Sequence, residues 1–342
     1  MKVNRDQFLK AIKAVHPATS NIEDMSNLYF SGKEVVAYND RICIHFPFES
    51  DFVFLINGTL LSNFLERVSS DEVMMSVKEN KLILKSKDEK ATLTTVIESE
   101  IISRVEKVKE ELTKLKKKTI PLPSDFVEGA SLCMFSASNE PADGTLTCLS
   151  VNGKEIVSTD KGRISIYTMA DEMPSIMFES SVASELEKFS EMGLTKCILS
   201  DSWIHFIADD GPTLSVRKIL GGYPDLQKII NAFKGKTKVK LPDELKEAVE
   251  TASLTINMDK NVANSVKIEL SENKLKCSGA SAKGEIEKNS KVVYSGKETT
   301  FSINALFLLQ VLSKATTMII REDGQQAMFR SGNFRHLMAL PV

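Results

Sequence analysis

The feature that most constrains the fold of this chain is its internal repetition. Residues 30–46 read FSGKEVVAYNDRICIHF, and residues 151–167 read the similar VNGKEIVSTDKGRISIY, with one additional residue at Lys161. A third and more divergent copy, SENKLKCSG, occupies residues 271–279, so the copies follow one another at intervals of about 120 residues. A fixed period indicates that the chain is built from similar structural units, and the fold must accommodate all three.

Strand and helix signals recur with the same period. Short alternating stretches bounded by Gly, Asn, Asp and Ser predict strands and hairpins. Between them, apolar residues three and four positions apart predict amphipathic helices. The expected helices cover residues 4–15, 58–68, 124–133, 181–191, 242–252 and 304–315. We therefore predict an α+β protein of three repeated domains, which we place at residues 1–118, 119–234 and 235–342.

Two stretches at the domain boundaries differ from the repeated units. Residues 104–118 place Val105, Val108 and Leu115 at helical spacing and carry a net charge of +4. We interpret them as a small amphipathic helix with a solvated basic face, in preference to a nucleic-acid contact. Residues 234–244 alternate lysine with small residues, which is typical of an exposed edge strand that resists unwanted pairing.

Composition narrows the class of protein. The 342 residues are 42% hydrophobic and 26% charged, as in globular proteins that dissolve in water, and they contain no apolar run of membrane-spanning length and no signal peptide. The five cysteines are scattered and odd in number, which indicates reduced thiols in the cytoplasm. A net charge of −2 argues against a protein whose whole surface binds nucleic acid, but it does not exclude a local basic surface.

Catalytic motifs are missing from the sequence. The segments YSGKET and FKGKTK lack the first glycine of a phosphate-binding loop, and LGGYPD is a turn. The four histidines, His16, His45, His205 and His336, show no metal-ligand spacing. Asp209, Asp210 and Gly211 are more simply a hairpin turn than a cation loop. We therefore predict a protein that is not an enzyme and needs no cofactor.

The triplicated unit without catalytic motifs resembles the bacterial-type DNA polymerase sliding clamp, the beta subunit of DNA polymerase III, including phage-encoded members. Residues 144–167 resemble the middle-domain segment of that family, and LGGYPDLQKII at 220–230 resembles the segment that joins its second and third domains. The start, MKVNRDQFLKAIKAV, and the tail, HLMALPV, are also similar to the family. The resemblance covers the whole chain.

The resemblance implies a fold, a function and partners. Clamp domains carry helices on one face and antiparallel sheets on the other, and two chains form a homodimeric ring around duplex DNA. Such a clamp is a non-enzymatic processivity factor in DNA replication. It tethers the replicative polymerase and other proteins that carry a clamp-binding peptide, and a clamp loader ATPase opens the ring. The implied location is the cytoplasm, in association with the nucleoid.

Site residues follow from the positions that match the family's motifs. The implied pocket for partner peptides lies between the second and third domains and is apolar, which suits aromatic or leucine anchors. Ordinary core packing is the alternative role for each of these residues. The peptide-binding residues would be Leu146, Arg163, Ile164, Pro224, Ile229, Met338, Leu340 and Pro341. The residues expected to contact DNA are Arg5, Lys10, Lys13, Lys161 and Lys188.

Some residues depart from the family pattern. Lys161 and Gly162 stand where the family has Gly and His, and the tail ends at Val342 without the usual basic-apolar ending. The six expected helices together carry a net charge of −4, which is unfavourable for close contact with phosphates. Two alternatives therefore stay open. One is a clamp-like interaction scaffold that does not encircle DNA, and the other, less favoured, is an enzyme on a similar repeated scaffold.

Overall fold

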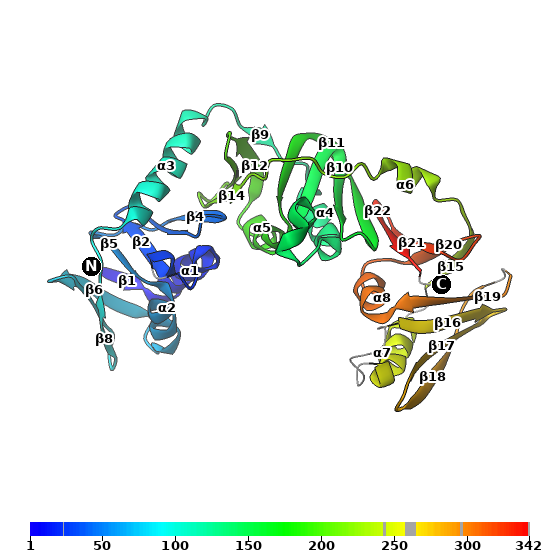
Figure 1. Cartoon of the computed structure of the whole chain (residues 1–342). Helices are drawn as coiled ribbons and strands as arrows, with labels where there is room; N and C mark the ends of the chain where they lie inside the picture. Colours follow the sequence, from blue (N-terminus) through cyan, green and yellow to red (C-terminus); the bar gives the residue numbers. More distant parts are fainter. Residues whose placement is uncertain (23, 242–243, 257–264, 295–296, 341–342) are drawn as a thin grey trace. The chain divides into compact units, whose positions relative to one another are not determined.

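The computed structural model describes all residues except 23, 242–243, 257–264, 295–296 and 341–342 (Figure 1). Its contacts divide the chain into two compact units. Unit 1 comprises Met1–Val127 with Ser181–Ile219, and unit 2 comprises Glu128–Ser180 with Leu220–Val342. The predicted middle domain therefore contributes to both units, and the three predicted boundaries stay a prediction. Among the described residues, no helix has the length and apolar character needed to cross a bilayer.

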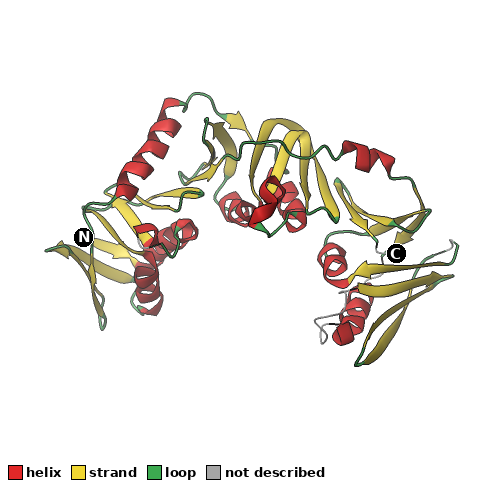
Figure 2. Cartoon of the chain, viewed as in Figure 1, coloured by secondary structure: helices red, strands yellow, loops and turns green. Residues whose placement is uncertain are grey.

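Unit 1 contains two antiparallel sheets and several helices (Figure 2). The four-stranded sheet has the order β1 (Lys2–Asn4), β6 (Glu72–Lys78), β7 (Lys81–Lys85), β8 (Lys90–Thr94). The eight-stranded sheet has the order β5 (Val53–Asn57), β2 (Asn27–Ser31), β3 (Glu34–Tyr38), β4 (Ile42–Pro47), β14 (Thr213–Arg217), β13 (Trp203–Ala208), β12 (Leu194–Leu199), β9 (Ile120–Pro121). The helices are α1 (Arg5–Val15), α2 (Gly58–Arg67), α3 (Glu100–Lys114) and α5 (Ala183–Ser190), and α4 (Phe126–Cys133) begins in this unit.

Unit 2 also contains two antiparallel sheets. The six-stranded sheet has the order β10 (Cys148–Thr159), β11 (Arg163–Glu179), β22 (Phe334–Ala339), β21 (Gln326–Ser331), β20 (Thr317–Arg321), β15 (Gly235–Lys240). The four-stranded sheet has the order β18 (Gly284–Lys291), β17 (Lys274–Ser281), β16 (Ser265–Ser271), β19 (Thr299–Asn304). Its helices include α6 (Gln227–Ala232), α7 (Glu244–Ile256) and α8 (Ala305–Leu312). β15 lies at a sheet edge, which confirms the edge strand predicted from its lysines.

Each copy of the repeated phrase contains a residue with a positive φ angle. Gly32, Gly153 and Asn273 have φ angles of 89°, 59° and 54°, in the left-handed region that glycine and asparagine tolerate best. The turns that follow the first two copies are also alike. Asn39 Oδ1 accepts from the backbone N–H groups two and three residues later, and Asp160 Oδ1 does the same. Gly32 lies in the turn between β2 and β3, and Asn273 lies in the turn between β16 and β17. Gly153 instead lies within β10, where the register with β11 shifts, so the turn predicted at the GKE phrase is wrong for the second copy.

The first two repeats share one continuous sheet. β4 pairs with β14, so that Ile44 lies opposite Leu214 and Cys43 opposite Ser215. The two paired strands lie far apart in the sequence, at Ile42–Pro47 and Thr213–Arg217. Backbone hydrogen bonds therefore join the repeats directly, in addition to side-chain packing.

The long helix α3 covers this joined sheet. Its buried residues Ile101, Val105 and Val108 form a cluster with Val36 of the first repeat and Trp203 of the second. The apolar spacing that predicted a helix at 104–118 is confirmed at Val105 and Val108, but the helix occupies Glu100–Lys114. It begins earlier because the Ser99 side chain caps it by accepting from the Ile101 N–H group at 3.1 Å.

Helix α7 lies unusually close to β17. An added Cβ at Gly279 would be 2.0 Å from the backbone oxygen of Ala252 in α7. The Thr255 hydroxyl donates a hydrogen bond to the Gly279 carbonyl at 2.9 Å across the same contact. The absence of a side chain at Gly279 thus sets the distance between helix and sheet.

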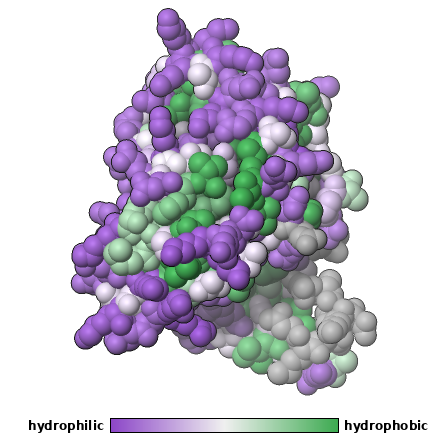
Figure 3. Space-filling model, turned by 90° about the vertical axis from the view of Figure 1, so that its left-hand side faces the viewer, coloured by the Kyte–Doolittle hydropathy of each residue, from purple (hydrophilic) through white to green (hydrophobic). Residues whose placement is uncertain are grey.

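Several large apolar side chains of unit 1 are exposed. They include Val53, Met74, Val96 and Ile97. Figure 3 shows one face of the molecule, on which apolar residues gather among hydrophilic ones. Exposed apolar patches of this kind often mark interfaces with other proteins.

Candidate functional site

Unit 2 contains a small, mainly apolar hollow of about 250 Å³. Its volume lies below the roughly 300–1,000 Å³ of typical small-molecule sites, so it suits the anchoring side chains of a peptide. Its apolar lining residues are Leu146, Ile164, Pro224, Leu226, Ile229, Leu337 and Ala339. The remaining lining residues are Thr159, Lys161, Gly162, Arg163 and Gln326.

Strand register and helix α6 build the apolar floor of this hollow. Ile164 of β11 lies directly opposite Leu337 of β22, and both are buried. Leu226, which precedes α6, packs in the same cluster together with Ile230. Ile229 lies on the rim with 44% of its surface exposed, so a bound peptide would cover an apolar side chain that now contacts water.

A rigid turn forms the polar rim. Thr159 Oγ1 donates to the Arg163 carbonyl at 2.7 Å, and Asp160 accepts from the Gly162 and Arg163 N–H groups at 3.1 Å each. Lys161 adopts a φ of 77° and forms an ion pair with Asp143. The hydrogen bond from Lys161, assisted by one from Ser138, lowers the pKa of the Asp143 carboxyl. The additional residue of the second repeat therefore ties the rim to the segment before β10.

Arg163 has a structural role in addition to its place at the hollow. Its side chain is 5% exposed, and Nε donates to Asp160 Oδ2 at 2.7 Å. The guanidinium lies over the Phe307 ring, 3.8 Å from the centroid, and donates to Gln310 of α8. Arg163 therefore links β11 to α8, and its charge is already satisfied within unit 2.

Two of the expected peptide-binding residues do not line the hollow. Met338 is opposite Arg163 in the register, so it faces the other side of the sheet from Leu337. Leu340 is two positions after Met338, so the alternation of an extended chain places it on the same side as Met338, and both are buried. Met338 and Leu340 are therefore not among the residues that line this hollow. Pro341 lies outside the described residues.

The other expected residues are brought together, and several neighbours were missed. Leu146, Arg163, Ile164, Pro224 and Ile229 all line the hollow. Lys161, which was expected to contact DNA, lines the hollow instead. The lining residues missed from the sequence are Thr159, Gly162, Leu226, Gln326, Leu337 and Ala339. No local signal in the sequence distinguishes Leu337 and Ala339 from their apolar neighbours, because they share a face with Ile164 only once the register is known.

Most of the cations expected to contact DNA are paired with carboxylates. Lys13 lies 2.7 Å from Glu66, and Lys188 lies 3.0 Å from Glu185. Arg5 lies 3.0 Å from its neighbour Asp6. Lys161 pairs with Asp143 at the rim of the hollow. These partners reduce the positive charge that the four side chains present to solvent, and a DNA-binding role for them stays a prediction.

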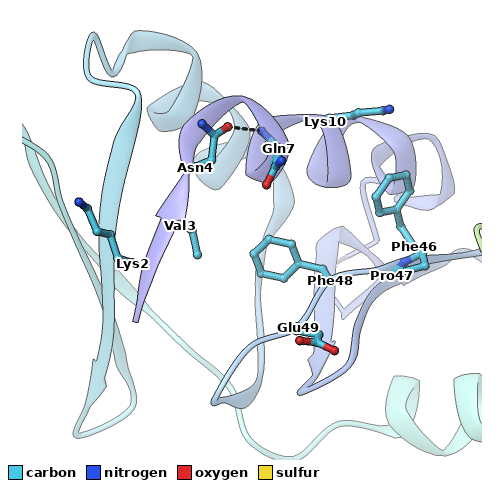
Figure 4. A pocket seen from close by; sticks show the side chains of 9 residues that line it. All are labelled: Lys2, Val3, Asn4, Gln7, Lys10, Phe46, Pro47, Phe48 and Glu49. Atoms are coloured by element: carbon cyan, nitrogen blue, oxygen red, sulfur yellow. Dashed lines mark hydrogen bonds between the residues drawn. The ribbon is translucent and has the colours of Figure 1, made fainter. Parts of the chain in front are cut away.

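Lys10 lines a second hollow, of about 450 Å³, in unit 1 (Figure 4). The Phe48 ring borders it and stacks on Phe8 with the centroids 4.9 Å apart. The charges of the lining are mixed, because Glu49 is present and Lys2 is paired with Glu72. The residues drawn in Figure 4 are Lys2, Val3, Asn4, Gln7, Lys10, Phe46, Pro47, Phe48 and Glu49.

Comparison with known proteins places this geometry in a fold family. Residues 232–323 match the model of the family described as DNA polymerase III beta subunit, C-terminal domain. No curated protein matches the chain significantly by sequence. The DNA polymerase sliding clamp from Pseudomonas aeruginosa is 17% identical to it, with a TM-score of 0.82 over 100% of this chain and 99% of that chain.

The chain has the sliding-clamp fold. The beta subunit from DNA polymerase of Streptococcus pyogenes supports the same assignment, with 19% identity and a TM-score of 0.79 over 99% of each chain. The DNA polymerase sliding clamp from Bacillus subtilis is 16% identical, with a TM-score of 0.78 over 100% of this chain and 98% of that chain. The predicted fold class is thereby confirmed.

This clamp fold also contains a buried Cys–His–Glu cluster, which bears on the enzyme alternative. Cys43 Sγ lies 3.4 Å from His45 Nε2, and His45 Nδ1 lies 3.5 Å from Glu34 Oε2. The order of groups resembles a nucleophile, a base and an orienting acid. However, Cys43 is 0% exposed and His45 is 5% exposed, so a substrate has no access to the sulfur. Among the described residues, no group of His, Cys, Asp or Glu side chains is arranged to hold a metal ion.

The electrostatics of this cluster are those of a structural ion-pair network. Burial alone would raise the pKa of Glu34, but hydrogen bonds and charges from His45 and Lys109 outweigh it and lower the pKa to about 2. Burial alone would lower the pKa of His45, but Cys43 and Glu34 raise it to about 10. Lys109 belongs to α3, so the network also fastens that helix to the sheet.

We expect Glu34 to make the stability of unit 1 depend on acid. Because its pKa falls from 4.5 to about 2 on folding, its contribution is complete above pH 4.5 and is lost as the pH falls toward 2. In the wild type, the free energy of unfolding should therefore fall by on the order of 2–3 kcal/mol between neutral and acid pH because of Glu34. Glu34→Gln should abolish this fall, which urea unfolding at a series of pH values would measure. Glu66→Gln, which changes an exposed ion pair, is the matched control. Equal acid dependence in Glu34→Gln and wild type would contradict the network.

Proposed function

We propose that this chain is a DNA sliding clamp, a processivity factor that encircles duplex DNA and tethers a replicative polymerase. The observation that carries the proposal is the likeness to sliding clamps across the whole chain, with a TM-score of 0.82. A ring that surrounds DNA holds its partner by topology. It therefore raises the local concentration of a tethered polymerase without tight contact to DNA.

Ring closure would need a second copy of the chain. The edge strands of the described sheets include β8 in unit 1 and β18 in unit 2, and an edge strand can form an antiparallel pair with another chain. If β8 of one copy pairs with β18 of the other, the remaining β8 and β18 pair in the same way, and two copies complete a closed assembly. Val96 and Ile97, which are exposed just beyond β8, would then lie near the contact and be covered.

The apolar hollow of unit 2 is the proposed docking site for partner proteins. Its floor of Ile164, Leu226 and Leu337 would contact the apolar anchors of a peptide, and the exposed Ile229 on the rim would be covered by them. The partners would be the replicative polymerase and other proteins that carry a clamp-binding peptide. The chain itself would perform no chemistry, so a separate clamp loader ATPase would open the ring. The site of action would be the cytoplasm, at the nucleoid.

The decisive experiment measures topological retention. The protein is loaded with its cognate loader onto nicked circular DNA, and half of the sample is then linearised. A clamp stays on the circles at raised salt, where direct phosphate contacts are weakened, and it slides off the linear molecules. Equal loss from circular and linear DNA would overturn the proposal. It would favour the scaffold that does not encircle DNA, for which the helix charge of −4 is the supporting observation.

A further inference from the structure

Unit 2 contains another hollow, of about 440 Å³, whose charged lining residues are all lysines. Lys240 comes from the end of β15, Lys246 from the first turn of α7, and Lys314 from the segment after α8. Among the described residues, no carboxylate lines this lysine hollow. The other lining residues are Leu241, Leu312, Ser313, Ala315, Thr316 and Ser331.

The electrostatics of the lysine hollow favour an anion. Three lysines that line one hollow raise the local density of positive charge, which favours a bound anion. Lys246 is 4.0 Å from Glu250, and Lys314 lies 5.5 Å from the centre of the Phe135 ring. Neither contact uses all three N–H donors of an ammonium group. The accumulation is local, because the whole chain carries a net charge of −2.

We infer that the lysine hollow binds backbone phosphates of duplex DNA. This inference rests on the proposed function and deepens it by naming a contact surface for the encircled duplex. Ammonium and hydroxyl groups are the donors that phosphate oxygens accept, and Ser313, Thr316 and Ser331 supply hydroxyls beside the lysines. Among the described lining residues there is no aromatic ring on which a base could stack, which favours duplex over single-stranded DNA.

The lining also explains how contact and sliding can coexist. The part of the lining that the structure describes contains neither arginine nor a side-chain amide, the groups that most often read base edges. The contact is therefore independent of sequence. Three lysines at one place contribute a few phosphate contacts only, and each contact adds affinity that falls with salt. The lysine hollow thus offers a weak hold at one place. The ion pair of Lys246 with Glu250, at 4.0 Å, is longer than those of Lys13 with Glu66, at 2.7 Å, and of Lys188 with Glu185, at 3.0 Å.

The test measures how tightly the full chain binds a short linear duplex. Fluorescence anisotropy of the labelled duplex gives the affinity at each of a series of salt concentrations. The double variant Lys246→Ala with Lys314→Ala should bind more weakly at every sequence. The slope of log affinity against log salt should become shallower by about 1.8, since each lost phosphate contact removes about 0.9. Lys246→Arg with Lys314→Arg should restore the slope.

The matched control removes the same charge elsewhere in unit 2. Lys267 and Lys276 are paired with Glu269 and Glu287 on the four-stranded sheet, and Lys267→Ala with Lys276→Ala should leave the salt slope unchanged. An unchanged slope in the Lys246 and Lys314 variant would overturn the inference. An equal effect on a single-stranded oligonucleotide would overturn the assignment to duplex. Binding of inorganic phosphate that both lysine substitutions abolish, with duplex affinity unchanged by the same substitutions, would assign the hollow to a free anion and overturn the inference as well.

This experiment is separable from the test of the proposed function. Retention on circular DNA measures closure of the ring, and it would persist in a clamp whose lysine hollow makes no contact. Loss of retention with an intact salt slope would instead reject the ring and keep the duplex contact.

Discussion

Gly279→Ala is expected to destabilise unit 2 by about 3 kcal/mol or more, because the added methyl group has no space. The nearest atom would be the backbone oxygen of Ala252 at 2.0 Å, and backbone within a helix cannot rotate away as a side chain can. Relief requires α7 to move outward. That movement also stretches the hydrogen bond from Thr255 to the Gly279 carbonyl, worth about 1 kcal/mol.

Thermal and urea unfolding would measure this effect. For a unit of this size, we expect the midpoint of thermal unfolding to fall by about 6 °C or more. Gly222→Ala is the matched control, since nothing lies within 4 Å of an added Cβ there. That change should be neutral or stabilising by about 0.5 kcal/mol through the unfolded state. Similar stabilities for both variants would show that α7 does not approach β17 as closely as described.

Ile229→Asp and Ala339→Phe are each expected to weaken peptide binding at least tenfold, about 1.4 kcal/mol. The first places a charge on the exposed rim, where a bound peptide would have to desolvate it. The second fills the hollow with an aromatic ring from an exposed position. Neither residue belongs to the buried core, so the fold should survive both changes.

Two controls separate binding from stability. Val293→Asp introduces the same charge at another exposed apolar residue of unit 2 and should leave peptide affinity unchanged. Met338→Ala should cost about 2–5 kcal/mol of stability, because Met338 is 1% exposed, while affinity stays the same. The measurement is calorimetric titration with a synthetic peptide that carries leucine and phenylalanine anchors, taken from the polymerase of the same source. Full affinity in both rim variants would place the partner site elsewhere.

Local features of the fold were predictable from the sequence because short-range physics decides them. The hairpin turn between β2 and β3 needs a residue that tolerates a positive φ angle, and Gly32 indicates this turn in the sequence. Helices α2 and α8 begin after Asn57 and Asn304, whose side chains cap them. The edge position of β15 followed from its lysines in the same way.

The site was only partly predictable because long-range register decides it. Every position from Leu337 to Leu340 is apolar, so the tail shows no alternation, and the pairing of Ile164 with Leu337 alone selects the face toward the hollow. The ion pair between Lys13 and Glu66 joins α1 to α2, and no local sequence pattern predicts it because the two helices are separate in the chain. The lysine hollow is assembled from three separate segments, which explains why no basic run pointed to it.

The pairing of β4 with β14 has a consequence for how the chain can be divided. A fragment that ends at residue 118 keeps β4 but loses β14, and it exposes a full row of backbone donors and acceptors in the middle of a sheet. The same cut removes Trp203 from beneath α3. The first repeat is therefore a unit of sequence but not of autonomous folding, and its natural complement is the segment Ser181–Ile219 supplied from further along the chain.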